Sequence, residues 1–167
     1  SLWSGEIVVK LYTLEIKQRF NHPIEKVFQF FSSPENLAVI TPGKMGFRIM
    51  TPTPITMNEG RLIDYTVKVL GIRVRWRSLV TSYQTPHEFT DEQILGPYSF
   101  WHHRHQFEKV KEGTLMTDTV TYAMPLGLLG RFMHWLTVRR LLDNIINYRR
   151  EKLEEIFSQT RSEEISI

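Results

Sequence analysis

Alternating apolar and polar side chains mark most of this chain as β-strand. From Arg61 to Leu70, apolar residues alternate with polar ones, and the same two-residue period recurs from Ile72 to Tyr83. This period places successive side chains on opposite faces of a strand, one of them buried. With Pro and Gly marking the turns, the pattern predicts seven strands: Val8–Phe20, Phe47–Thr51, Arg61–Leu70, Ile72–Tyr83, Glu88–Leu95, Tyr98–Lys109 and Thr114–Met124.

Three other segments show the spacing of amphipathic helices. Pro23 opens the first, which ends near Phe31, and Ser33-Pro34 opens a second short helix that runs to about Ile40. The segment from Arg131 to about Ser158 predicts one long helix with an apolar face and a charged face that includes Arg149. At about 1.5 Å per residue this helix spans about 42 Å, which is enough to cross a whole sheet.

The order of elements predicts an α+β fold, because one strand, two short helices, six strands and a long helix follow one another. We expect a single domain over residues 1–160 and a frayed tail over 161–167, where the apolar pattern is lost from Gln159 onward. A twisted seven-stranded antiparallel sheet tends to curl. The long helix across its concave face would then enclose a cavity.

Composition excludes several classes of protein. The 167 residues contain no Cys, which excludes disulfides, thiolate metal sites and thiol catalysis. No apolar run approaches the roughly 18–20 residues of a membrane span, so no stable membrane insertion is expected. The net charge is only +3, and Arg73, Arg75 and Arg77 alternate along a strand as a solvated face, which does not favour nucleic-acid binding. Without Cys or a visible signal peptide, we expect a cytoplasmic protein.

The segment from Trp101 to Phe107 carries the most distinctive candidate chemistry. His103 and His105 share one strand face with Trp101 and Phe107, so both histidines are expected to point inward. Two histidines at this spacing can bind a metal, supply a general base near neutral pH, or line a cavity wall. A metal site needs further ligands, and we expect no metal site here.

Two carboxylates lie close to these histidines along the sheet. Asp118 stands on an otherwise apolar face with Met116 and Val120, so it needs a buried partner such as His103, His105 or an Arg. That pair could fix strand register or act as an acid–base pair.

The position of Asp91 depends on the turn at Gly96-Pro97. A two-residue turn pairs Asp91 with His102, and a three-residue loop pairs it with His103, because one residue of slip moves every side chain across the sheet. Only the longer loop brings one polar set together in the cavity: Asp91, His103, His105 and Asp118. The sequence leaves both alternatives open.

Four local strings carry a resemblance to a known superfamily: Phe28–Leu37; Phe89–Gln93 with Gly96-Pro97-Tyr98; Trp101–Phe107; and Gly113-Thr114 with Asp118, Tyr122, Pro125 and Gly127. Together with the element order, they resemble the helix-grip fold of the SRPBCC superfamily, which includes START domains, pollen-allergen-like proteins and polyketide cyclases. Within this superfamily they resemble a bacterial branch described as cyclase/dehydrase or ligand-binding. The resemblance implies a curved sheet, a long helix over its concave face, and a cavity for an apolar or amphipathic molecule.

The sequence therefore favours a protein that encloses a lipid, isoprenoid or aromatic polyketide-like ligand, with no cofactor. Expected cavity contacts are Tyr65, Trp76, Phe89, Asp91, Gln93, Trp101, His103, His105, Asp118, Tyr122, Phe132 and Trp135. The alternative is a cyclase/dehydratase-type enzyme, in which His103 or His105 is the base and Asp118 or Asp91 orients it. A third class, an interaction module, would show a filled interior beneath a large exposed apolar patch.

Overall fold

The computed structural model describes residues 9–165, with side chains described up to Ser158. It contains one antiparallel sheet of seven strands in the order β1-β7-β6-β5-β4-β3-β2. The strands are β1 (Tyr12–Phe20), β2 (Arg48–Ile49), β3 (Leu62–Val69), β4 (Ile72–Gln84), β5 (Glu88–Leu95), β6 (Phe100–Val110) and β7 (Gly113–Ala123). The predicted α+β class and the seven-stranded sheet are confirmed.

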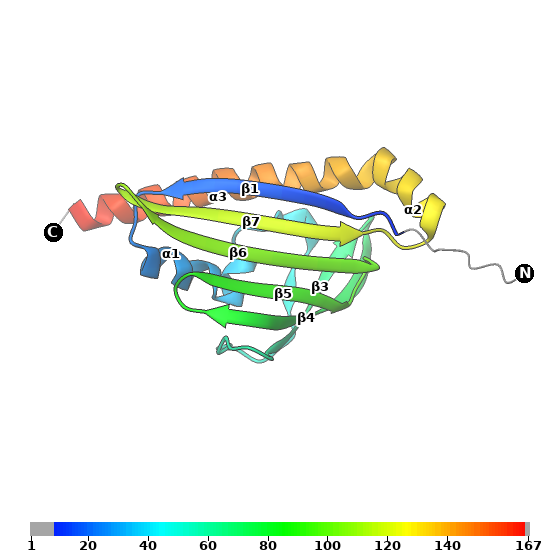
Figure 1. Cartoon of the computed structure of the whole chain (residues 1–167), viewed down its shortest axis with the longest axis horizontal. Helices are drawn as coiled ribbons and strands as arrows, with labels where there is room; N and C mark the ends of the chain where they lie inside the picture. Colours follow the sequence, from blue (N-terminus) through cyan, green and yellow to red (C-terminus); the bar gives the residue numbers. More distant parts are fainter. Residues whose placement is uncertain (1–8, 166–167) are drawn as a thin grey trace, which may run out of the picture.

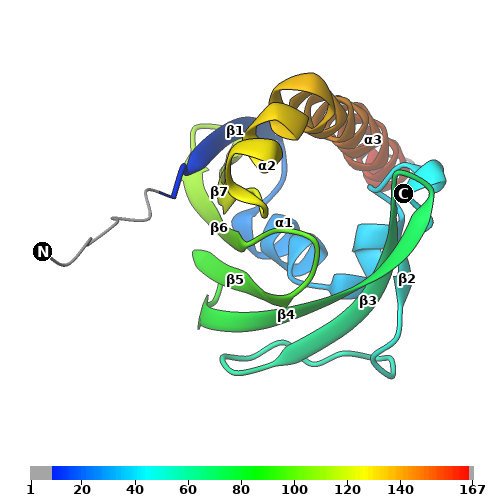
Figure 2. The same ribbon diagram turned by 90° about the vertical axis from the view of Figure 1, so that its right-hand side faces the viewer.

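Helices stand at two places in the chain. Between β1 and β2 come α1 (Ile24–Phe31) and two single turns, η1 (Pro34–Ala38) and η2 (Gly43–Met45). After β7 come α2 (Gly127–Met133), the turn η3 (His134–Val138) and α3 (Arg139–Ile165). The α3 helix runs along the length of the sheet (Figure 1), and the curved sheet wraps around the space that α3 closes (Figure 2). Within the described residues, no helix is long and apolar enough to cross a membrane.

Three predicted elements differ in the structure. The strand expected at Phe47–Thr51 is only β2, because Pro52 and Pro54 lack the N–H groups that would extend its ladder. The second short helix is the single 3₁₀ turn η1, which suits its five-residue length. The first strand begins at Tyr12, and Val8 lies outside the described residues.

The long C-terminal helix also differs from the prediction at both ends and in its middle. It begins at Gly127 rather than Arg131, and its backbone is helical through Ile165 rather than to about Ser158. Residues 166–167 lie outside the described part. In the middle, η3 is a π-helical turn, whose wider hydrogen-bonding loop holds one residue more than an α-turn. That extra residue rotates the α2 side chains relative to those of α3.

An aromatic core closes one end of the space between sheet and helix. Phe28 of α1 packs edge-on against Phe89 and Phe107, with ring centroids 5.8 and 5.3 Å apart. Leu153 and Phe157 of α3 belong to the same buried cluster. This core fixes α1, the sheet and the C-terminal half of α3 in one arrangement.

Candidate functional site

A cavity of about 490 Å³ lies between the concave face of the sheet and α3. This volume falls in the range of typical small-molecule sites, about 300–1,000 Å³. Leu70 and Leu126 both line the cavity, although 72% and 75% of their surfaces are exposed. The cavity therefore opens between the β3–β4 turn and the start of α2, which lie at the same end of the molecule (Figure 1). Phe31 and Leu153 line the closed end.

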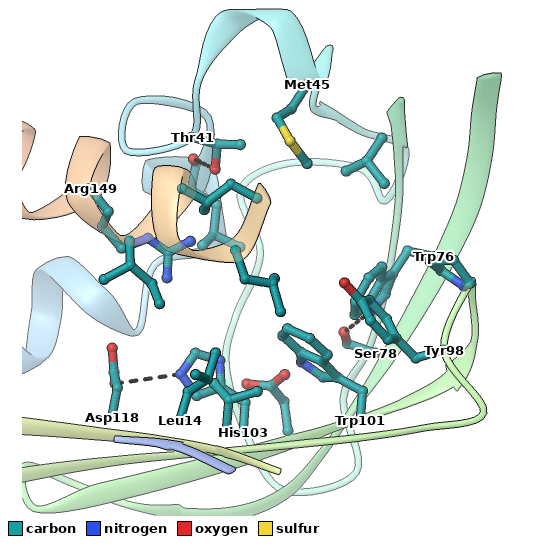
Figure 3. A pocket seen from close by; sticks show the side chains of 18 of the residues that line it. Leu14, Thr41, Met45, Trp76, Ser78, Tyr98, Trp101, His103, Asp118 and Arg149 are labelled. Carbon is teal, nitrogen blue, oxygen red and sulfur yellow. Dashed lines mark hydrogen bonds and ion pairs between the residues drawn. The ribbon is translucent and has the colours of Figure 1, made fainter. Parts of the chain in front are cut away.

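Aromatic side chains form one part of the cavity wall. The indoles of Trp76 and Trp101 meet at nearly a right angle with centroids 5.3 Å apart, and Tyr65 stacks on Trp76 at 5.7 Å. The Trp76 Nε1–H donates to the Ser78 hydroxyl at 3.1 Å, so this buried donor is satisfied without a ligand. Figure 3 shows this aromatic wall with Tyr98 on one side of the pocket. Such a surface suits a flat or elongated apolar molecule.

A polar cluster occupies the other side of the cavity. Asp91 of β5 pairs with His103 of β6, and His105 of β6 pairs with Asp118 of β7. This register corresponds to the longer of the two loops that the sequence left open at Gly96-Pro97. The four side chains converge because they stand on one face of three adjacent strands, and all four line the cavity.

His105 lies between the two carboxylates. Its Nε2 is 3.0 Å from Oδ2 of Asp91, and its Nδ1 is 3.0 Å from Oδ1 of Asp118, the second contact being poorly aligned for a hydrogen bond. Burial disfavours a charge on His105, but the two carboxylates outweigh it and raise its pKa to about 9. Burial likewise opposes charge on Asp118, and the histidines hold the pKa of this carboxyl far below its usual range. At neutral pH the centre is an imidazolium held by two carboxylates.

His103 differs from its neighbour in both contacts and charge. Its ring stacks on that of His105, with centroids 3.7 Å apart, and its Nε2 is 3.5 Å from Oδ1 of Asp118. This nitrogen is buried and has no hydrogen-bond partner among the described residues. Burial and the adjacent charged His105 lower the pKa of His103, against the pull of Asp118. His103 is therefore neutral at physiological pH, and its other ring nitrogen, Nδ1, makes no hydrogen bond among the described residues.

Arg149 of α3 is a site residue that the sequence analysis missed, because it was assigned to the charged face of the long helix. In the structure its side chain reaches into the cavity, opposite Asp118 and His103 (Figure 3). The spacing along the helix could have predicted this position. Arg149 is four residues from both Ile145 and Leu153 and so shares their cavity-facing side. Burial lowers the pKa of its guanidinium, and Asp118 opposes that shift.

Eight of the twelve expected contacts line the cavity: Tyr65, Trp76, Phe89, Asp91, Trp101, His103, His105 and Asp118. The structure places the other four elsewhere. The Gln93 amide spans the β5–β6 loop, donating to the Tyr98 carbonyl at 2.7 Å and accepting from the Tyr98 N–H at 3.1 Å. The Tyr122 hydroxyl is 2.6 Å from Nε2 of His134 and lies behind the wall.

Phe132 and Trp135 are the other two residues that do not line the cavity. They are 53% and 75% exposed on the outside of the helix. The physical reason is the π turn at η3, which breaks the uniform 3.6-residue period from which their inward orientation was predicted. Leu141, Leu142 and Ile145 form this part of the wall instead.

The polar cluster also has the spacing of a metal site. Ligand atoms of Asp91, His103 and His105 all lie within 4.8 Å of one another. Both ring nitrogens of His105 already face carboxylates. An ion bound to His105 would therefore have to displace a ring proton that is attracted by one of these carboxylates. Asp91 and His105 are thus engaged with each other, and His103 is the one member of this group that makes no hydrogen bond among the described residues.

A curved antiparallel sheet that grips one long helix around a ligand-sized cavity defines a helix-grip domain. The chain belongs to the family described as "Polyketide cyclase / dehydrase and lipid transport", whose model matches residues 20–146. This SRPBCC-type family is the one that the sequence motifs resemble. No curated protein matches the chain.

Several solved structures share this fold. TTHA0849 of Thermus thermophilus has a TM-score of 0.70 at 16% identity, covering 89% of this chain and 99% of that one. SA2116 of Staphylococcus aureus has a TM-score of 0.69 at 10% identity, covering 94% and 99%. The di-domain ARO/CYC StfQ, from the steffimycin biosynthetic pathway, has a TM-score of 0.65 at 13% identity, covering 94% of this chain and 52% of that one. At these identities the similarity shows the fold alone.

Proposed function

We propose that this protein binds a hydrophobic or amphipathic small molecule, such as a lipid, an isoprenoid or an aromatic polyketide-like compound, between the sheet and α3. The observation that carries this proposal is the apolar cavity of about 490 Å³ that opens beside Leu126. The family description, which names polyketide cyclase, dehydrase and lipid transport, supports the same ligand classes. An interaction module with a filled interior fits less well, because the interior is hollow.

Burial of the ligand supplies the affinity. Transfer of apolar surface out of water is worth about 25 cal/mol per Å², so about 400 Å² of buried ligand surface gives roughly 10 kcal/mol before ordering costs are subtracted. The aromatic wall around Trp76 and Trp101 offers flat surface for this contact. The few polar groups of the cluster then fix which end of the molecule enters first.

Titration with the neutral fluorophore N-phenyl-1-naphthylamine tests this proposal. The matched variants are Ile145→Trp, which fills the cavity from α3, and Asn147→Trp, which adds the same side chain on the exposed side of the same helix. We expect saturable binding in the wild type and in Asn147→Trp, and at least about tenfold weaker binding in Ile145→Trp. Equal binding by all three proteins would place the fluorophore outside the cavity and contradict the proposal.

A second candidate function is proton transfer on a carbonyl-containing ligand, as in cyclisation or dehydration. The observation that favours it is the neutral His103, whose Nε2 faces Asp118 and whose Nδ1 makes no hydrogen bond among the described residues. In this reaction Nδ1 of His103 would take a proton from the carbon next to the ligand carbonyl, and Asp118, 3.5 Å from Nε2, would stabilise the imidazolium formed. His105 is a poorer base, because its two carboxylates keep it protonated.

Deuterium incorporation next to the carbonyl of an aromatic methyl ketone, followed by mass spectrometry in D₂O, measures this proton transfer. We expect His103→Gln to lower the protein-dependent rate at least about 100-fold. The matched control is His102→Gln, because His102 points to the opposite face of the same strand and should have no effect. A rate that is the same with and without protein would reject the enzyme, while leaving ligand binding intact.

A further inference from the structure

Arg149 brings a cation into a cavity whose walls are otherwise largely apolar. Its guanidinium extends from α3 toward the polar side of the pocket (Figure 3). Within the described part of the chain it makes no hydrogen bond or ion pair, and its Nε is buried without a partner. A guanidinium stays charged in proteins, and a charge withdrawn from water is costly unless it is paired.

The nearby carboxylates do not serve as partners of Arg149. Asp91 and Asp118 are both within 3.0 Å of ring nitrogens of His105, which lies between them. They attract Arg149 only through space, and that attraction opposes the effect of burial on its pKa. The guanidinium therefore has donors aimed at the space inside the cavity (Figure 3) and no acceptor for them among the described residues.

We propose that Arg149 binds the acidic head of the ligand, a carboxylate, while the apolar body of the ligand lies along the aromatic wall toward the mouth. This inference rests on the proposed ligand-binding function and names the class of ligand: an amphipathic monocarboxylic acid. A planar carboxylate matches the paired donors of a guanidinium and can accept two parallel hydrogen bonds. The apolar body would contact the walls formed by Trp76 and Trp101.

The surrounding charges permit an acid in this position. The carboxylates of Asp91 and Asp118 are opposed by the cations of His105 and Arg149, so the cluster is close to neutral, and His103 adds no negative charge. No excess negative charge repels the incoming acid, and the fit to the guanidinium decides its orientation.

Calorimetric titration with two matched pairs of probes tests the inference. Dodecanoic acid is compared with 1-dodecanol, and 2-naphthoic acid with 2-naphthol, at pH 7.5. We expect the wild type to bind the acid of at least one pair about tenfold or more tightly than the alcohol. The pair that shows this preference distinguishes an acyl chain from an aromatic ring system as the body of the ligand.

Three variants assign the preference to Arg149. Arg149→Met, which keeps an unbranched apolar stem, should abolish the preference for the acid and change the affinity for the alcohol less than about threefold. Arg149→Lys should retain part of it, because an ammonium keeps the charge but not the paired geometry. Arg140→Met removes the same charge from an exposed position of α3 outside the cavity wall and should leave both affinities unchanged.

Each outcome decides one of the two proposals. Alcohols that bind the wild type as tightly as the acids, or an acid preference that survives in Arg149→Met, would overturn the role of Arg149 and leave ligand binding standing. Should Arg149→Met fail to fold, the comparison of acid with alcohol in the wild type and in Arg149→Lys remains decisive. If none of the four probes binds and N-phenyl-1-naphthylamine also fails, the ligand-binding function itself is wrong.

Discussion

The imidazole of His105 spans three strands: its Nδ1 lies 3.0 Å from Oδ1 of Asp118 on β7, and its Nε2 lies 3.0 Å from Oδ2 of Asp91 on β5. Asp118 is only 3% exposed, so its contact with His105 is shielded from bulk water, whereas the Asp91 side chain is 22% exposed. The cluster therefore contributes to the stability of the sheet as well as to the polarity of the cavity. Its two roles can be separated by measurements on the protein without ligand.

Removal of the Asp118 charge tests the structural role. Asp118→Asn leaves His105 buried with one carboxylate, and loss of one partner of a buried pair costs about 3 kcal/mol or more. We expect the free energy of unfolding in urea to fall by about that amount. Asp143→Asn, the same exchange at an exposed position of α3, should change it by less than about 0.5 kcal/mol. A loss of equal size in both variants would show that Asp118 makes no special contribution.

The pH dependence of stability follows from the two histidines. The pKa of His105 is raised from 6.5 to about 9, so its contribution is complete below pH 6.5 and is lost as pH rises toward 9. The pKa of His103 is lowered, so the folded protein loses stability as pH falls below 6.5, where the unfolded chain binds the proton more readily.

Stability should therefore peak near pH 6.5 and decline by about 2 kcal/mol between pH 6.5 and 9. Urea titrations at half-unit pH intervals measure this profile. In Asp118→Asn the alkaline decline should flatten, because His105 has lost the neighbour that raises its pKa. A stability that rises between pH 7 and 9 in the wild type would contradict the charged state assigned to His105.

Gly130 tests the packing of α2 at the mouth of the cavity. A Cβ at this position would collide with the carbonyl oxygen of Pro125, which is backbone and cannot move aside. We expect Gly130→Ala to lower the melting temperature by several degrees, since 1 kcal/mol corresponds to about 2–4 °C in a chain of this size. Gly43→Ala, where the added atom meets nothing within 4 Å, should stay within about 1 °C of the wild type. Equal melting temperatures would mean that α2 packs differently.

The hydrogen bond between the Tyr122 hydroxyl and His134 fastens the π turn to the sheet. Tyr122→Phe removes the 2.6 Å bond and leaves a buried nitrogen of His134 unsatisfied, which costs about 1–3 kcal/mol. Differential scanning calorimetry should show this loss for Tyr122→Phe and none for Tyr148→Phe, whose ring is 37% exposed. An unchanged melting transition in Tyr122→Phe would show that this hydrogen bond does not help to hold the helix against the sheet.

The strand periodicity predicted the sheet and the inward face of β6, because successive side chains of a strand point to opposite faces of the sheet. His103, His105 and Asp118 could thus be placed on inward faces from local pattern alone. Asp91 could not, since its register depends on the conformation of the loop at Gly96-Pro97. The residue pattern allowed two loops, and the pairing Asp91 to His103 is a property of the folded sheet.

The C-terminal helix shows where a helical period misleads. Phe132 and Trp135 were predicted to face the cavity, but the π turn at η3 rotates them outward. Arg149 was missed for a different reason: a charged side chain on an apolar stripe was assigned to the polar face by its chemistry rather than by its spacing. A long flexible stem allows its head to reach a buried position that composition alone would not suggest.

Native mass spectrometry tests the central claim, occupancy of the cavity, most directly. The wild type, Ile145→Trp and Asn147→Trp would be purified side by side from the same host and equilibrated with the same lipid extract. The account predicts a 1:1 adduct of a few hundred daltons on the wild type and Asn147→Trp and its absence from Ile145→Trp, where the new side chain fills the cavity. An adduct of equal abundance on all three proteins, or on none, would contradict it.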